Sequence, residues 1–278
     1  MPKGKGLIYL TSVRLRKSGR EKRRKLQNRK VIVGFSGGVT SAWCAGWALR
    51  NFPREEVVLL FHDTKAEDAD TYRFLREMAE KLDMPITERS DGRSLDEVFE
   101  DHNAIASDRM AFCSEELKQI PGTKYIKELQ SAGIKEIVRV VGFSAMEVTR
   151  VQRYAAACMK LSGLFSSVTA RFPLIEENVT KQDCADWCSC TMGVPVPAMY
   201  AWSEHANCVG CVRGGKAYWL AVKENRPDVF EHRKAQEREF GHQMFRHYVS
   251  LEDLEKSGLK REVNRKESIE IGPCGCGS

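Results

Sequence analysis

The feature that most constrains the fold is a short apolar segment that runs directly into a glycine turn. Val31–Phe35 (VIVGF) is apolar and rich in β-branched residues, and Ser36-Gly37-Gly38 follows it. The next stretch, Val39–Leu49, is apolar and compatible with a helix. A strand, a glycine turn and a helix in this order are typical of the first unit of an α/β fold.

The alternation of strands and helices continues along the chain. Further strands are expected at Val57–Phe61, Met84–Thr87 and Glu136–Phe143, with an extended segment at Arg171–Ile175. The expected helices in the first part of the chain are Asp68–Leu82, Leu95–Asp101 and Ser114–Leu129. The second of these begins with a capping box of Ser94 and Glu97, and the third is interrupted at Pro121-Gly122. Later helices are expected from a cap at Thr180 to Cys190 and at residues 216–225 and 228–247. This pattern predicts a doubly wound, mostly parallel sheet with helices on both faces.

Three regions follow from this pattern. Residues 1–30 form a basic arm, residues 31–175 form the α/β domain, and residues 176–278 form a C-terminal extension that carries most of the cysteines. A chain of 278 residues is long enough for one large α/β domain with appendages. Ligands in such sheets bind beyond the carboxyl ends of the strands, and the distinctive residues of this chain gather there.

Composition narrows the class of protein. No apolar run approaches the length needed to cross a bilayer, and no apolar segment of a secretory signal follows the basic N-terminus, so we expect a cytoplasmic protein without membrane contact. The chain has ten cysteines. In a reducing compartment, clustered cysteines bind metal or carry out redox chemistry more often than they form disulfides.

Positive charge is concentrated at the N-terminus. Residues 1–30 contain twelve Lys or Arg and one acidic residue, although the net charge of the whole chain is only +6. Such a block is a candidate contact for the phosphates of tRNA or DNA. The alternative is a solvated tail that only aids solubility.

The turn Ser36–Ser41 (SGGVTS) has the chemistry of a phosphate-binding loop. Gly37 and Gly38 allow the backbone to approach a ligand closely, and the N–H groups at the start of a helix attract anions. Ser36, Thr40 and Ser41 add hydroxyl donors. The loop is neither a Walker A motif nor a G-x-G-x-x-G dinucleotide motif.

This SGGxxS pattern resembles the PP-loop of ATP pyrophosphatases and of phosphoadenylyl-sulfate (PAPS) reductases. The resemblance extends from about residue 31 to residue 231 and rests on the order of several motifs. It implies that Ser36, Gly37, Gly38, Thr40 and Ser41 bind the pyrophosphate or phosphosulfate of an adenine nucleotide, which is PAPS, adenylyl sulfate or ATP.

Further motifs carry the resemblance. His62-Asp63-Thr64-Lys65 is similar to the second-strand motif of the family, with Lys65 in place of a glycine; it implies that Asp63 and Thr64 contact the nucleotide or, with ATP, Mg²⁺. Cys113-Ser114-x-x-Leu117-Lys118-x-x-Pro121 implies that Lys118 approaches the phosphates. Gly142-Phe143-Ser144 with Arg150 resembles the glycine-to-arginine segment near the nucleotide, and Arg150 is suited to a bidentate phosphate contact.

The Cys208-Val209-Gly210-Cys211 knuckle is the second strong signal, because its glycine lets both thiolates point at one metal site. Cys113 is the expected third ligand, and His205, Cys274 or Cys276 could provide a fourth. Three cysteines with an open fourth position resemble the [4Fe–4S] site of several PP-loop sulfurtransferases. Zinc, or a reduced pair without metal, is the alternative. We expect Cys184, Cys188 and Cys190 to belong to the core.

The C-terminal Cys274 and Cys276 resemble the nucleophilic cysteine of PAPS reductases in position, although the surrounding reductase pattern is absent. Because the resemblance covers the main domain, the leading hypothesis is a PAPS reductase-like enzyme that uses a cysteine thiolate and a thioredoxin-like dithiol partner. The second is an ATP-dependent sulfurtransferase that adenylylates and thiolates a nucleic acid. The third is a non-catalytic protein that binds nucleotides or nucleic acids.

Overall fold

The structure is a computed structural model, and it describes residues 28–107, 109–245, 249–259 and 269–271. Most of the basic arm lies outside these residues, as do Cys274 and Cys276. Arg29 and Lys30, which we had counted in the arm, belong to the first strand. Arg29 forms an ion pair with the buried Glu56 at 2.6 Å.

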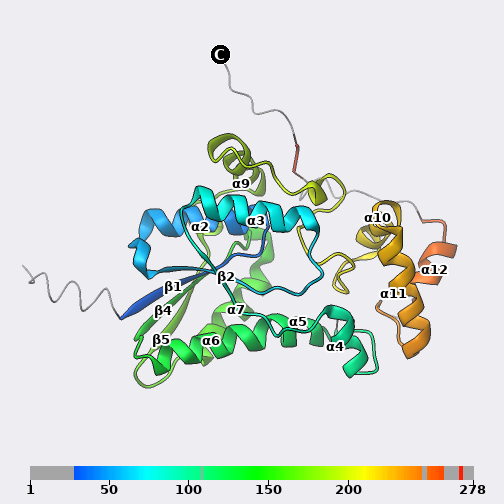
Figure 1. The fold of residues 1–278 in the computed structure, drawn as a ribbon, viewed down its shortest axis with the longest axis horizontal. Coiled ribbons are helices and arrows are strands. Elements are labelled where there is room, and N and C mark those ends of the chain that lie inside the picture. The colour runs from blue at the N-terminus through cyan, green and yellow to red at the C-terminus, as the bar shows by residue number, and fades with distance from the viewer. Residues whose placement is uncertain (1–27, 108, 246–248, 260–268, 272–278) are drawn as a thin grey trace, which may run out of the picture.

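Five parallel strands form a single sheet in the order β3-β2-β1-β4-β5 (Figure 1). They are β1 Arg29–Gly34, β2 Val57–Phe61, β3 Ile86–Glu88, β4 Glu136–Val140 and β5 Ser167–Arg171. The chain winds outward from β1 to β2 and β3, and then returns to the other side of β1 for β4 and β5. The predicted α/β class and its parallel sheet are confirmed.

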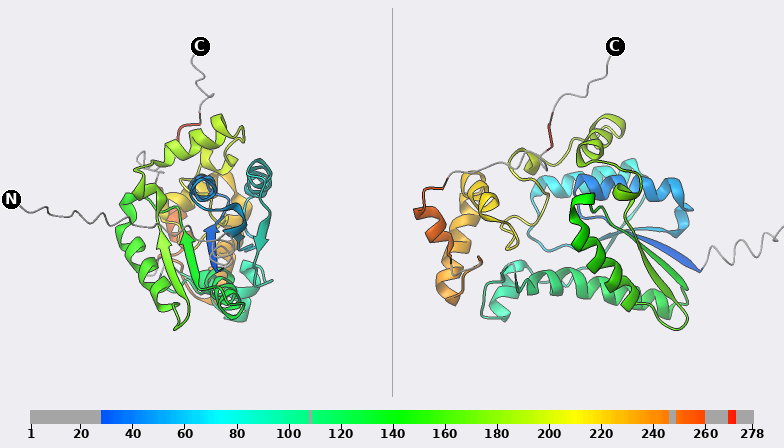
Figure 2. Two further views of the ribbon diagram at one scale, coloured as in Figure 1. Left: turned by 90° about the vertical axis from the view of Figure 1, so that its left-hand side faces the viewer. Right: turned by 180° about the vertical axis from the view of Figure 1, so that it is seen from behind.

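Helices cover both faces of the sheet (Figures 1 and 2). Helices α2 (Val39–Asn51) and α3 (Ala69–Lys81) pack on one face, whereas α6 (Ile120–Ser131) and α7 (Val148–Lys160) pack on the other. Because side chains alternate along a strand, Val31 and Val33 of β1 join the first cluster and Ile32 joins the second. The hydrophobic strands are therefore buried on both sides, as a parallel sheet requires.

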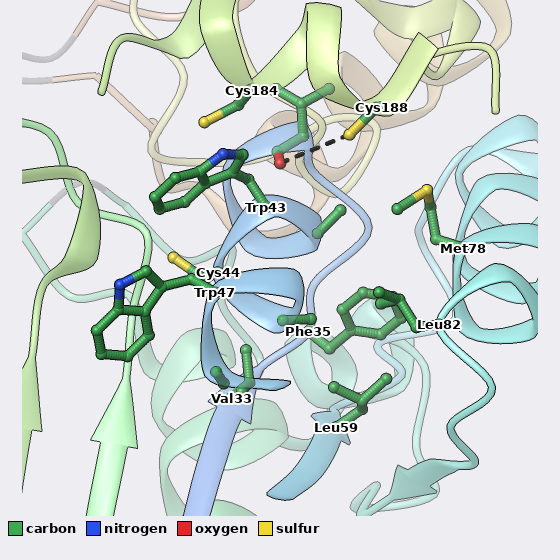
Figure 3. Close-up of a cluster of buried hydrophobic side chains, with 14 of the residues drawn as sticks. Val33, Phe35, Trp43, Cys44, Trp47, Leu59, Met78, Leu82, Cys184 and Cys188 are labelled. Atoms are coloured by element: carbon green, nitrogen blue, oxygen red, sulfur yellow. Dashed lines mark hydrogen bonds between the residues drawn. The ribbon is translucent and has the colours of Figure 1, made fainter. Parts of the chain in front are cut away.

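The larger core lies between the sheet and helix α2 (Figure 3). In this close-up the side chains of α2 lie over β1 and β2, and a short helix, α9 (Lys181–Asp186), covers them from above. Residues that fill this space include Val33, Phe35, Trp43, Cys44, Trp47, Leu59, Cys184 and Cys188. This packing fixes the position of the loop at the start of α2.

A separate cluster lies beyond the carboxyl ends of the strands. It is formed by α4 (Leu95–Asp101), α5 (Phe112–Ser114), α10 (Lys216–Asn225), α11 (Pro227–Phe240) and α12 (Leu251–Lys256). Trp219 and Phe230 are fully buried at its centre, and their rings meet edge to face at 6.3 Å. This small helical layer holds the cysteine knuckle against the edge of the sheet (Figure 1).

Several predicted boundaries are wrong. The last strand is Ser167–Arg171, and the expected extended segment beyond it is instead the helical turn α8 (Pro173–Glu176). Pro121 does not interrupt its helix: the chain is helical from Phe112 to Ser131, with a π-helical turn at Glu115–Gln119 directly before α6. Helix α11 ends at Phe240 rather than at residue 247, since Gly241 adopts a left-handed φ of 66°.

The expected position of Cys190 is also corrected. Cys184 and Cys188 are fully buried, as predicted, but Cys190 is exposed. It lies in η4 (Trp187–Thr191), a π-helical turn that continues α9. The extra residue in such a turn rotates the following side chains, so the helical spacing of the three cysteines could not place the third. Among the described residues, no helix is long and apolar enough to span a membrane.

Candidate functional site

The candidate site lies where β1 and β4 end side by side, at the point where the chain reverses its winding direction. In an open parallel sheet this is the position at which a crevice forms and ligands bind. The loop after β1, Ser36–Ser41, and the loop after β4, which begins near Gly142, meet there. A Cβ atom on Gly142 would lie only 2.9–3.0 Å from atoms of Thr40, so the two loops touch through backbone.

The Ser36–Ser41 loop is held in shape by its own residues. Gly37 has a φ of 85°, a conformation that side chains disfavour. The Ser36 N–H donates to the Ser41 hydroxyl at 3.2 Å, and that hydroxyl donates to the Gly38 carbonyl at 2.7 Å. Ser41 therefore shapes the loop with its side chain rather than offering a free hydroxyl to a ligand.

Several donors of this loop have no partner within the described part of the chain. They include the N–H groups of Thr40 and Ser41 in the first turn of α2 and the hydroxyls of Ser36 and Thr40. No acidic side chain lies in that first turn, and α2 is 13 residues long, so its N-terminus carries an uncompensated partial positive charge. The loop can accept a phosphate or sulfate group.

Asp63 lies at the end of the neighbouring strand β2. Its Oδ1 accepts hydrogen bonds from the Tyr72 hydroxyl at 2.5 Å and from the Lys65 N–H at 2.8 Å. Lys65 has a φ of 55°, so the chain keeps a left-handed turn where the resembled family has glycine. Asp63 Oδ2 takes no part in these bonds and is the oxygen that could contact a ribose or a cation.

Thr64 faces the cysteine knuckle. Its side chain is buried, and the hydroxyl lies 3.1 Å from the Cys208 sulfur and donates to Glu67 at 3.1 Å. Lys118 also donates to this Glu67 oxygen, at 3.4 Å, and the Cys208 thiol donates to it at 3.5 Å. Thr64 and Lys118, both expected to contact the nucleotide, are thus brought together with Cys208 around one buried carboxylate.

The knuckle itself is shaped by glycine and by Tyr218 of α10. Gly210 has a φ of 79°, and a Cβ atom there would lie 2.7 Å from Val229. The Tyr218 hydroxyl accepts hydrogen bonds from the Gly210 and Cys211 N–H groups at 2.9 and 3.3 Å, and donates to the Cys208 carbonyl at 3.0 Å. The Val209 N–H donates to the Ala66 carbonyl at 2.7 Å, which ties the knuckle to the loop after β2.

Burial keeps two of these thiols, Cys208 and Cys113, neutral in the absence of a ligand. It raises the pKa of Cys208 to about 12, although the nearby Lys118 ammonium opposes the change. Burial and the charge of Cys211 raise the pKa of Cys113 to about 11. Burial lowers the pKa of Lys118, whereas the carboxylate of Glu67, and Cys208 and Cys211 in their ionised forms, raise it, and the net change is upward.

Cys113 lies close enough to Cys211 of the knuckle for the two to interact electrostatically, so the three expected thiol ligands are neighbours, and metal binding by them stays a prediction. No three Cys, His, Asp or Glu side chains among the described residues are close enough together to hold a single metal ion. The side chains as they lie do not fit a zinc site, and His205 is exposed. Three thiols can still serve an iron–sulfur cluster, in which each thiolate binds its own iron atom.

Arg150 lies on α7 beside the loop after β4. Its guanidinium forms an ion pair with Glu147 at 2.6 Å and stacks over the Phe143 ring at 4.4 Å. Glu147 in turn accepts a hydrogen bond from the Ser144 N–H at 2.9 Å. The side chain of Arg150 is 64% exposed, so a phosphate contact would require it to leave Glu147.

Sequence reasoning missed two residues of this site. Glu67 is the carboxylate on which Thr64, Lys118 and Cys208 converge, and its position four residues after Asp63 is the only local signal. Tyr200 lies in η5 (Ala198–Ala201), and its hydroxyl accepts the Val39 N–H at 3.1 Å. It is separated from the loop by 161 residues, and no local signal marks it.

A scan of the chain against models of protein families finds no match. A search among curated proteins finds no significant match either. The chemistry of the site must therefore be argued from the arrangement of these residues.

Proposed function

We propose that the chain binds the phosphate-bearing part of an adenine nucleotide on the Ser36–Ser41 loop and carries out sulfur chemistry in the manner of PAPS reductases. One observation carries this proposal: unpartnered N–H donors at the start of α2 lie where β1 and β4 end side by side, next to a backbone contact between Thr40 and Gly142. The thiols near Lys118 lie at the same edge of the sheet and support the sulfur chemistry.

The proposed reaction begins with a nucleotide-linked sulfate. A cysteine thiolate, for which Cys276 and Cys274 are the candidates, attacks the sulfur atom, and the S–O bond to the nucleotide phosphate breaks as the nucleotide leaves. The thiolate sulfur then carries the sulfonate. One thiol of a thioredoxin-like partner attacks that cysteine sulfur, and sulfite leaves with the bonding electron pair. The partner's second thiol then attacks the mixed disulfide, which releases the enzyme cysteine as a free thiol and leaves the partner as a disulfide.

Lys118 and Glu67 would set the charge next to the thiols. The ammonium compensates negative charge that develops on Cys208 or on a bound sulfur group, and Glu67 holds the ammonium in place. A [4Fe–4S] cluster bound by Cys113, Cys208 and Cys211 would supply an iron with an open position for a sulfur ligand.

The grouping of three thiols favours one second candidate, an ATP-dependent sulfurtransferase that adenylylates and thiolates a nucleic acid. In that reaction ATP with Mg²⁺ occupies the loop, and the basic N-terminal segment contacts the RNA or DNA. The two candidates share the nucleotide site and differ in the nucleotide and in the sulfur acceptor.

Calorimetry on protein purified without oxygen separates the candidates. We expect PAPS or adenylyl sulfate to bind more tightly than ATP. Preference for ATP together with co-purified nucleic acid would favour the sulfurtransferase. Tight nucleotide binding without turnover of any sulfur substrate would indicate a non-catalytic protein, and failure of all three nucleotides to bind would refute the proposed site.

Iron and sulfide analysis of cysteine variants tests the cluster. Cys208→Ser should lose most of the bound iron, because it removes one of three ligands. Cys158→Ser is the matched control, since Cys158 is also buried but lies on α7 in a different hydrophobic cluster. Equal iron content in both variants would show that the knuckle does not hold the cluster.

A further inference from the structure

Tyr200 is a buried phenol that contacts the Ser36–Ser41 loop from a distant part of the chain. Its side chain is 7% exposed, and its oxygen accepts a hydrogen bond from the backbone N–H group of Val39 at 3.1 Å. Val39 is the first residue of α2. The phenol oxygen therefore lies at the helix N-terminus, where an anion bound to the loop would sit.

The hydroxyl proton of Tyr200 is unused. A phenol can accept at its oxygen and has one proton to donate. No described residue accepts that proton, and burial raises the pKa of Tyr200 to about 12, so the proton is present at neutral pH. Because the Val39 N–H already donates to the oxygen, the proton must point away from Val39.

The loop is built to bring its backbone next to this phenol. A Cβ atom on Gly38 would lie 3.2 Å from the Tyr200 oxygen, so only glycine leaves the approach uncrowded. The Lys181 ammonium lies 5.5 Å from the centre of the Tyr200 ring, which adds positive charge to the same region. Both features favour an anion near the hydroxyl.

A second hydroxyl beside the loop is independent of Tyr200 and also lacks a partner. Thr71 of α3 is fully buried, and its Oγ1 makes no hydrogen bond. The Thr71 methyl group lies 2.4 Å from the position that a Cβ atom on Gly37 would take. A buried hydroxyl without a partner is costly, and this one belongs to a side chain whose methyl group packs against Gly37 of the loop.

We infer that Tyr200 is an anion-binding residue whose O–H donates to an oxygen of the phosphate or sulfate group held by the Ser36–Ser41 loop. This inference rests on the proposed function, and it adds a donor that lies outside every motif of the loop. Tyr200 would favour a ligand with a tetrahedral oxyanion group, one oxygen of which lies close to the first turn of α2.

The geometry allows one opposite outcome, which the experiment must distinguish. Because the phenol oxygen accepts the Val39 N–H, it could occupy the place of an anion oxygen. In that case removing the hydroxyl would free a donor and tighten binding, whereas loss of a direct donor weakens it.

Titration of the full-length protein with inorganic pyrophosphate, and separately with ATP, tests the inference. We expect Tyr200→Phe to weaken binding of both probes about tenfold, the effect of losing one hydrogen bond to a charged group. Tyr125→Phe is the matched control: Tyr125 is 8% exposed and lies on α6 against the opposite face of the sheet. It should bind both probes like the wild type.

The outcomes are distinct. Unchanged or tighter binding by Tyr200→Phe, with a wild-type protein that binds pyrophosphate, overturns the role of Tyr200 and leaves the proposed function standing. A wild-type protein that binds neither probe refutes the proposed function itself. If Tyr200→Phe does not fold, amide exchange in the wild type decides: saturating pyrophosphate should slow exchange in residues 198–201, and unchanged exchange there overturns the inference.

Discussion

At the scale of single residues, glycine decides whether the Ser36–Ser41 loop can form. Gly37 combines a left-handed φ of 85° with a close approach to Thr71. Gly133, at the end of α6, has nearly the same φ of 88° but has open space around it. Alanine at Gly133 adds backbone strain alone, whereas alanine at Gly37 adds both strain and crowding, so comparing the two variants distinguishes the two effects.

Gly37→Ala should destabilise the protein by about 2–4 kcal/mol, because it adds backbone strain and a clash with Thr71. Gly133→Ala should cost only about 1 kcal/mol, the strain alone. Denaturant unfolding measures both values. Nucleotide binding should be lost in the first variant and retained in the second; equal stability and equal binding in both would show that the turn at Gly37 is not required.

At the scale of elements, two π-helical turns and one buried carboxylate position the site. Lys118 lies in η2 (Glu115–Gln119) and Cys188 in η4, and each turn carries one residue more than a regular helix would need. In the helical layer, Glu237 of α11 accepts the Met244 and Leu251 N–H groups at 2.9 and 2.6 Å. This carboxylate ties α11 to the start of α12.

Glu237→Ala should destabilise the protein by about 2–4 kcal/mol at pH 4.5, because two buried N–H groups lose their acceptor. Burial raises the pKa of Glu237 above 4.5, so ionisation costs more in the folded than in the unfolded state. The contribution of Glu237 to the free energy of unfolding is therefore lost as pH rises through the raised pKa. The difference in this free energy between the wild type and Glu237→Ala should become smaller.

Urea unfolding of both proteins between pH 4.5 and pH 8 measures this difference. Glu239→Ala is the control on the same helix, since Glu239 is exposed and its removal should change stability by less than about 0.5 kcal/mol. A gap between the wild type and Glu237→Ala that widens with pH would contradict the direction of the pKa change.

At the scale of the whole molecule, the described residues start at the edge of the sheet opposite to the candidate site. Asn28 precedes β1 and lies at the amino edge, whereas the Ser36–Ser41 loop follows the same strand at the carboxyl edge (Figure 1). Residues 1–27 carry ten Lys or Arg and one Glu. The rest of the chain is net negative, so we expect the main attraction for nucleic acid to come from this segment.

A protein that begins at residue 28 should therefore lose salt-sensitive binding to tRNA and DNA, while nucleotide binding persists because β1 is intact. Fluorescence anisotropy at several salt concentrations measures the slope of affinity against salt, which should be steep for the full chain. A full-length variant with the ten basic residues replaced by Gln is the matched control and should behave like the truncated protein. Retained binding in either would place the contact elsewhere.

The sequence by itself determined the features that depend on neighbouring residues. The strand, glycine turn and helix at the start of the sheet, the position of β2 and the capping boxes at Ser94 and Thr180 were all predicted, because each arises from contacts within a few residues. Cys113 was expected as the third ligand beside the Cys208–Cys211 knuckle, and the structure places it near Cys211.

Only the tertiary structure decided which side chains meet. The convergence of Thr64, Lys118 and Cys208 on Glu67 joins segments up to 144 residues apart, and Tyr200 reaches the loop across 161 residues. The start of β5 was likewise set by its pairing with β4 and not by its own composition. Hydrogen bonds of this kind depend on how separate elements pack, and no local pattern records that packing.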